Sequence, residues 1–338
     1  MFSSSLADAP HVREPVHAPV AHLIRGGIVE GIHYGSVVVL GADGEVQLQI
    51  GDIEAAFYPR SALKPVQAVA MARAGLPLDG ELLSLTAASH SGEERHLAGA
   101  RRILDLAGLT EGHLRNVPDM PFDAVVRDAW VSEGRLPSRL AQNCSGKHAA
   151  MLYTCMLNGW TLEDYLDPGH PLQRAVAEIV EDLTGQRVAG VTVDGCGAPL
   201  FSISLHGLAR AAARITTAAP GTPEARVADA MREHAEMASG SGRDVAALMR
   251  AVPELLTKDG FEGVQVAALP DGRAVAVKIA DGANRARVPV TAAALARAGV
   301  DPESLTEFQG EALLGGGREV GCVRPVRSLD PVVGSARA

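Results

Sequence analysis

The chain of 338 residues has few of the features that mark secreted or membrane-bound proteins. It contains four cysteines, too few for a disulfide scaffold at this length, which indicates a reducing compartment. No segment approaches 18 consecutive apolar residues, and the first residues lack the apolar stretch of an export signal. We therefore expect a cytoplasmic protein that does not bind membranes.

Positive charge is also scarce. The net charge is -9, with no run of basic residues to neutralise a phosphate backbone, so nucleic acid is not an expected partner. The 31 basic residues include four lysines: Lys64, Lys147, Lys258 and Lys278. A guanidinium keeps its proton, so lysine is the residue to retain where a neutral amine is needed. Each lysine is thus a candidate functional residue, unless codon bias alone left these four.

The apolar fraction of 47% is enough for a large core, and the segments suited to strands lie near both ends of the chain. Residues 36–40 and 45–50 flank Ala42-Asp43-Gly44, and residues 263–269 and 273–280 flank Pro270-Asp271-Gly272, so both pairs have a hairpin signal. The helical patterns cover 61–74, 93–107, 147–157, 171–184, 222–237 and 290–298.

This order of elements predicts an α+β fold. An antiparallel sheet made from both chain ends would pack on helices, and a helical insertion would form a second lobe. No repeat or long linker divides the chain. We expect a single catalytic domain over residues 21–327, between flexible ends at 1–20 and 328–338.

The strongest local motif is Ser61-Ala62-Leu63-Lys64-Pro65. Proline fits the first turn of a helix, so Ser61 falls at the helix start and Lys64 lies one turn later on the same face. A serine hydroxyl becomes a nucleophile when a neighbouring base takes its proton, and a desolvated lysine can serve as that base. The alternative is that Ser61 caps the helix and Lys64 lies on the surface.

Two further segments carry polar side chains. Ser91 and Glu94 form a capping-box pattern, which leaves Ser89 free to relay a proton to a leaving group. Lys278 lies in the apolar strand pattern 274–280, where a lysine needs a partner or a purpose unless the strand is at an edge.

Cys144, Lys147 and His148 crowd one predicted helix start, and Cys196 follows a short predicted strand. Two thiols and an imidazole could bind zinc, but lysine is an unusual ligand and the spacing fits no standard zinc finger. The spacing by itself leaves a zinc site open.

Taken in order, these motifs resemble the asparaginase II family, the thermolabile bacterial type whose fold is similar to serine β-lactamases, penicillin-binding proteins and glutaminases. The resemblance runs from about Arg25 to Lys278. The segments that carry it are 60–65, 88–91, 143–148, 194–196 and 277–282, with further similarity at 25–30 and 240–243.

The resemblance implies a role for each motif residue. Ser61 would be the nucleophile and Lys64 its base, with Ser89 and Lys278 completing a serine-lysine tandem. Zinc would be held by Cys144, Lys147 and Cys196. The residues implied to contact the substrate are Arg60, His148 and Asp194.

The expected activity is that of an L-asparaginase, which hydrolyses the side-chain amide of L-asparagine to L-aspartate and ammonia through an acyl-enzyme. A homodimer is the expected assembly. The alternatives are a zinc-dependent amide hydrolase, a β-lactamase or D-peptidase-like serine hydrolase, and a non-catalytic binding protein on the same scaffold.

Overall fold

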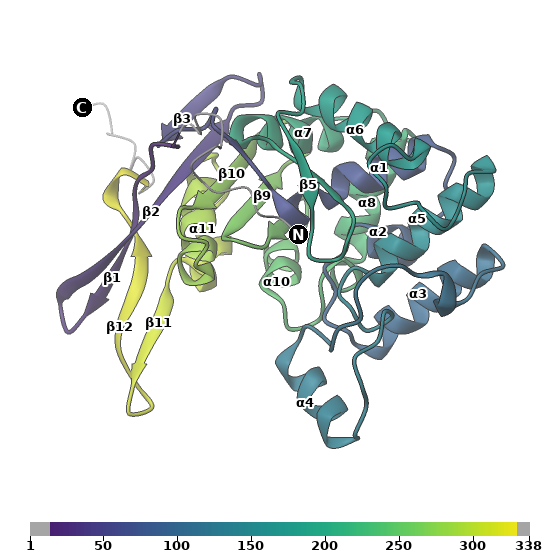
Figure 1. Ribbon diagram of the computed structural model, residues 1–338. Coiled ribbons are helices and arrows are strands. Elements are labelled where there is room, and N and C mark those ends of the chain that lie inside the picture. The colour runs from purple at the N-terminus through teal and green to yellow at the C-terminus, as the bar shows by residue number, and fades with distance from the viewer. Residues whose placement is uncertain (1–13, 330–338) are drawn as a thin grey trace, which may run out of the picture.

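A computed structural model describes residues 14–329, and its main element is an eight-stranded antiparallel sheet (Figure 1). The strand order is β11-β12-β1-β2-β10-β9-β8, and β3 pairs with β2. The strands are β1 (Ala18–Arg25), β2 (Ile28–Leu40), β3 (Val46–Ile50), β8 (Leu256–Gly260), β9 (Val264–Ala268), β10 (Ala274–Ile279), β11 (Glu311–Gly315) and β12 (Arg318–Pro325).

Both faces of the central strands are apolar because helices cover each side. Along β10, Ala274 and Ala276 belong to the large core that includes the helical lobe, whereas Val275 and Val277 belong to a second core. Alternate residues of a strand point to opposite faces, which explains this division. Helix α7 (Leu205–Thr216) packs on the first face, and α11 (Arg287–Arg297) contributes to the core on the second.

The remaining helices pack mainly against one another beside the sheet, and Figure 1 shows them as a second lobe. They are α1 (Lys64–Arg73), α2 (Gly80–Thr86), α3 (Glu94–Leu106), α4 (Ala124–Ser132), α5 (Ser145–Asn158), α6 (Pro171–Thr184), α8 (Pro223–Glu233), α9 (Ala235–Ala238) and α10 (Asp244–Ala251). Two short pairs of strands accompany them: β4 (Ala56–Phe57) with β7 (Ile203–Ser204), and β5 (Val191–Val193) with β6 (Pro199–Phe201).

The predicted α+β architecture is confirmed, including the sheet built from both chain ends and the helical lobe. The capping box at Ser91 is wrong: Glu93 is the N-cap residue of α3, and the Ser91 hydroxyl donates to the Ser239 carbonyl. Most of the two predicted flexible ends lies outside the described residues, and β1 already begins at Ala18. Within residues 14–329, no helix is long and apolar enough to span a membrane.

Strand β8 makes a close backbone approach to the 3-10 turn Arg60–Leu63. A Cβ atom on Gly260, the last residue of β8, would lie 2.4 Å from the Pro59 carbonyl oxygen and 3.2 Å from the Ala62 Cβ. Glycine is therefore required for the strand to reach this turn.

Replacing Gly260 by alanine should overpack this junction and lower the free energy of unfolding by about 1–3 kcal/mol. The matched control is Gly112→Ala, because a Cβ there meets only the Thr110 hydroxyl oxygen at 3.5 Å. The control should change stability by less than about 0.5 kcal/mol. Urea unfolding measures both, and equal stability of the two variants would contradict the packing argument.

Candidate functional site

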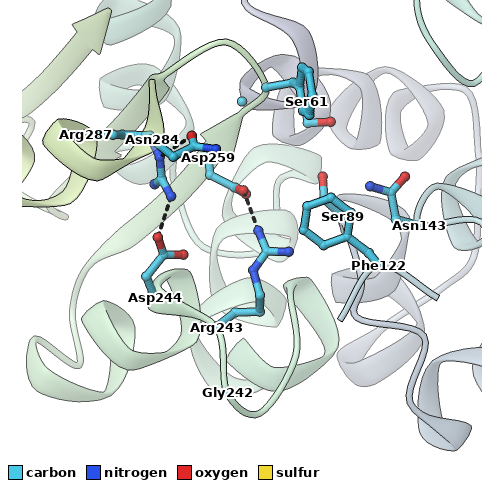
Figure 2. Close-up of a pocket in the computed structure, with 12 residues that line it drawn as sticks. Ser61, Ser89, Phe122, Asn143, Gly242, Arg243, Asp244, Asp259, Asn284 and Arg287 are labelled. Carbon is cyan, nitrogen blue, oxygen red and sulfur yellow. Dashed lines mark hydrogen bonds and ion pairs between the residues drawn. The ribbon is translucent and has the colours of Figure 1, made fainter. Parts of the chain in front are cut away.

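A cavity of about 390 Å³ lies where the end of β8 faces the helical lobe (Figure 2). Two hydroxyl side chains, two phenylalanines and several charged groups line it. The lining residues are Ser61, Ser89, Phe122, Asn143, Gly242, Arg243, Asp244, Asp259, Gly260, Phe261, Asn284 and Arg287. They come from seven separate segments of the chain, which the fold brings to one place.

Ser61 lies in the 3-10 turn that leads directly into α1. The preceding residue, Arg60, has a φ of 53°, a left-handed conformation that costs a non-glycine residue about 1–3 kcal/mol. Among residues 14–329, no hydrogen bond joins the Ser61 hydroxyl to Lys64 or to another side chain. The hydroxyl is thus free to react with a molecule in the cavity.

The Ser89 hydroxyl lies between two buried lysines. Lys64 Nζ donates to Ser89 Oγ at 3.0 Å, and also to the Ala88 carbonyl at 2.5 Å and the Cys144 sulfur at 3.0 Å. Lys258 Nζ donates to the same Ser89 Oγ at 3.0 Å. One hydroxyl oxygen therefore connects two amines that solvent does not reach.

The charge of Lys258 is balanced by its neighbour Asp259, whose carboxylate contacts the Lys258 ammonium and accepts a hydrogen bond from Arg243 Nη2 at 2.7 Å. Burial lowers the pKa of Lys258 to about 8, although the Asp259 charge opposes this change. Lys258 and Arg243 hold the pKa of Asp259 well below its usual range despite burial. The Lys258 amine is therefore partly neutral near pH 8.

Lys278 lies away from this hydroxyl and its lysines, contrary to the expectation that its ammonium would join Ser61 and Ser89. Lys278 Nζ donates to the Glu262 carbonyl at 2.6 Å and the Ile279 carbonyl at 2.7 Å. It lines a separate, shallower pocket with Arg60 and Glu262. By strand alternation, Lys278 shares the face of β10 with Ala274 and Ala276, which faces the helical lobe, but its side chain extends toward the β8–β9 turn.

Lys258 is the residue that sequence reasoning missed in this arrangement. It is one of the four lysines, and Gly260 follows it two residues later, so its scarcity and the adjacent turn were available signals. Strand β8 reads Leu-Thr-Lys-Asp-Gly, which has little strand signal because two of its five residues are charged. Their mutual ion pair, which offsets the cost of burial, is visible only in the structure.

The residues predicted to hold zinc meet next to Lys64. Lys147 Nζ lies 3.3 Å from the Cys196 sulfur, and Cys144 and Cys196 pack together in one buried cluster. A hydrogen bond from the Cys144 thiol lowers the pKa of Cys196 well below its usual value. The same hydrogen bond, with burial, raises the pKa of Cys144 to about 12.

Two sulfurs and one amine form a donor set that fits zinc with one coordination position left open. Burial disfavours the charged form of Lys147, but its electrostatic interactions with Cys196, Cys144 and Asp194 outweigh burial and raise its pKa. Metal binding would therefore release a proton from Lys147. Within residues 14–329, no group of three or more histidine, cysteine or carboxylate side chains could hold a metal, so this set depends on its lysine.

The three residues predicted to contact substrate lie around the same thiols. Arg60 Nε donates to Asp194 Oδ1 at 2.7 Å, and burial of Asp194 is outweighed by Lys147 and Arg60, which lower its pKa. His148 Nδ1 is hydrogen-bonded to the Tyr165 hydroxyl at 2.8 Å, and its buried Nε2 has no partner among the described residues. Burial lowers the pKa of His148 well below 6.5, so its ring is neutral.

The chain is similar to several solved structures at low sequence identity. A protein named Mglu, in its native form, is 15% identical, with a TM-score of 0.42 over 76% of this chain; the match spans 62% of the Mglu chain. A β-lactamase from Mycobacterium bovis is 15% identical (TM-score 0.41, 79% of this chain and 95% of that one). EstCE1, a hydrolase with promiscuous acyltransferase activity, is 14% identical (TM-score 0.37, 80% and 91%).

No curated protein matches the sequence significantly. The protein-family comparison gives a clear result, since residues 21–325 match L-asparaginase II. This range includes every residue of the cavity. It also includes Cys144, Lys147 and Cys196, which together are called the thiol cluster. Because the match extends over nearly all of the described residues, the chain belongs to the L-asparaginase II family.

Proposed function

We propose that the protein is an L-asparaginase that uses Ser61 as its nucleophile. Membership of the family makes it a hydrolase that acts on amides. The observation that carries the finer proposal is that Ser89 Oγ lies 3.0 Å from both Lys64 Nζ and Lys258 Nζ and faces the same cavity as Ser61. A hydroxyl bonded to two buried amines can move a proton in either direction.

In the proposed reaction, Ser61 Oγ attacks the amide carbon of asparagine as its proton passes to the paired amines. Lys64 takes up this proton as it passes one of its own through Ser89 to a neutral Lys258. The carbon–nitrogen bond then breaks, and the leaving nitrogen takes a proton through Ser89 to depart as ammonia. Water cleaves the resulting ester and releases aspartate. In this scheme, Lys258 fills the position for which the sequence suggested Lys278.

The charged groups of the substrate would meet Arg60, Asp194 and His148. Asp194 can accept from the α-amino group, and the Arg60 guanidinium can donate to the α-carboxylate. The buried His148 Nε2 is available to a bound molecule. We further propose, from the sequence alone, that the enzyme is cytoplasmic and acts as a homodimer.

Zinc is part of this proposal, held by Cys144, Lys147 and Cys196. When bound there, it would supply a positive charge that attracts the carboxylate of the substrate. The Cys144 sulfur accepts a hydrogen bond from Lys64, so one side chain is shared between the thiol cluster and the lysine pair. The position of the Lys64 amine therefore depends on whether Cys144 is protonated or bound to a metal.

The central test compares lysine variants in an assay of ammonia release from asparagine. Ser61→Ala, Lys64→Met and Lys258→Met should each lower kcat/KM by about 100-fold or more, as expected for loss of the nucleophile or of proton transfer. Lys278→Met is the matched control, because within residues 14–329 its amine hydrogen-bonds only to backbone carbonyls, away from Ser89. A larger loss with Lys278→Met than with Lys258→Met would reverse the assignment. Full activity of Ser61→Ala on a zinc-loaded enzyme would favour the alternative of a zinc-dependent amide hydrolase.

The pH dependence follows from the protonation of Lys258. The pair can accept the Ser61 proton only when one amine is neutral, so kcat/KM should rise with pH and level off above about pH 8. Asp259→Asn removes a charge that raises the pKa of Lys258, so its profile should shift to lower pH. Asp271→Asn, in an exposed hairpin, is the control and should leave the profile unchanged. A profile that is flat between pH 6 and 9 would rule out this base.

Metal content tests the thiol cluster separately from activity. After dialysis against micromolar zinc, the wild-type protein should retain the metal, while Cys196→Ser should bind it about 10–100 times more weakly. Cys322→Ser is the control, since Cys322 lies on β12 outside the cluster. Elemental analysis and zinc titration measure both. Equal zinc content in the two variants would remove zinc from the proposal.

A further inference from the structure

The cavity beside Ser61 is separate from the groups assigned above to the amino and carboxyl groups of asparagine. Ser61 and Ser89 line it, whereas its lining includes neither Asp194 nor any residue of the thiol cluster. Arg60 lines the other pocket, on the side of Lys278. Ser61 therefore stands between a side that holds the aspartyl group and a second side with no assigned ligand.

The second side is where the leaving group must go. In the proposed reaction the leaving nitrogen takes its proton through Ser89, so it must lie next to the Ser89 hydroxyl as the bond breaks. That hydroxyl faces the cavity (Figure 2). Ammonia has a single heavy atom, about the size of a water molecule, whose share of liquid volume is about 30 Å³. A cavity of about 390 Å³ has room for a much larger leaving group.

The opposite wall of the cavity favours a negative charge on that leaving group. Arg243 and Arg287 line it, while the two carboxylates present are already paired: Asp244 with Arg287 and Asp259 with Arg243 (Figure 2). Asp259 also pairs with Lys258. The Arg243 Nη1 is buried without a partner among the described residues. A carboxylate that enters the cavity would therefore meet two guanidinium groups, and both carboxylates already there are paired.

Asn284 supplies a further donor on this wall. Its Oδ1 accepts a hydrogen bond from Arg287 Nε at 3.4 Å, and no described hydrogen bond uses its amide NH₂ group. The side chain is exposed to the cavity. An amide donor beside a guanidinium suits a carboxylate.

The distance across the cavity suits a short leaving group. Between Ser89 and the Arg243 guanidinium lie the Lys258 ammonium, 3.0 Å from Ser89 Oγ, and the Asp259 carboxylate, 2.7 Å from Arg243 Nη2. In an α-amino acid the nitrogen and the carboxylate carbon are about 2.5 Å apart. An amino acid bound along these contacts, with its nitrogen at Ser89, would direct its carboxylate toward Arg243. The Phe122 and Phe261 rings, both exposed, would border its side chain.

We propose that this cavity is a leaving-group subsite for an α-amino acid, so that the enzyme also cleaves β-aspartyl dipeptides with a small second residue. The inference rests on the proposed function. Ser61 Oγ forms the ester as the amide carbon–nitrogen bond breaks, and the amino acid leaves with the proton relayed by Ser89. Water then releases aspartate and regenerates Ser61, so each peptide and one water yield aspartate and one free amino acid.

The test uses three substrates: L-asparagine, β-aspartyl-glycine and β-aspartyl-glycinamide, with released ammonia, glycine or glycinamide as the readout. The wild-type enzyme should cleave β-aspartyl-glycine with a kcat/KM at least about tenfold above that for the glycinamide, which lacks the carboxylate. Arg243→Gln and Asn284→Asp should each reduce this ratio toward one. Arg250→Gln, within the helix that begins after Arg243 but exposed and paired with Glu236, should keep it.

The ratio is measured at one pH, so any change in the protonation of Lys258 affects both peptides alike. Asn284→Asp alters an exposed side chain and covers the case in which Arg243→Gln does not fold. Hydrolysis of asparagine without cleavage of β-aspartyl-glycine would overturn the subsite and leave the proposed function intact. A ratio near one in the wild type, or unchanged in both subsite variants, would also overturn it. Failure on all three substrates would end the proposed function and this inference together.

Discussion

The site depends on placing two ammonium groups against one hydroxyl oxygen inside the protein. Lys64 and Lys258 are both fully buried, where an isolated charge is costly, and like charges close together increase that cost. The structure offsets it in two ways. Lys64 directs its three protons to a carbonyl, a hydroxyl and a sulfur, while Lys258 pairs with Asp259. The pair still has more positive than negative charge, which favours the loss of a proton from one of the two amines.

This constraint explains the surroundings of the pair. Asp259 must be ionised to hold Lys258, and Arg243 helps keep it ionised by donating from the other side. Arg243 in turn lies over the Phe122 ring, 4.5 Å from its centroid, which connects the carboxylate to the segment before α4. The electrostatics of β8 and the packing of the helical lobe are therefore parts of one arrangement.

The sequence predicted the architecture and much of the site, because both depend on local patterns. Helix α6 begins and ends at the residues that its helical pattern predicted, Pro171 and Thr184. The Ser61 motif and Ser89 were singled out by their local patterns, whereas the zinc role of the cysteine-lysine set came from the family resemblance. Lys258 was not, since its burial depends on an ion pair, and an ion pair in a strand leaves no periodic signal. Ser91 shows the opposite case: its capping pattern is real, but a long-range acceptor at Ser239 takes the hydroxyl.

The joining of the two chain ends in one sheet has a consequence for how the protein folds. Strand β1 lies between β2, its immediate neighbour in sequence, and β12, almost 300 residues later. During synthesis on the ribosome, one edge of β1 stays unpaired until β12 has emerged. Contacts between such distant segments slow folding and expose strand edges to aggregation. Truncation near the C-terminus would therefore damage the earliest strands to be made.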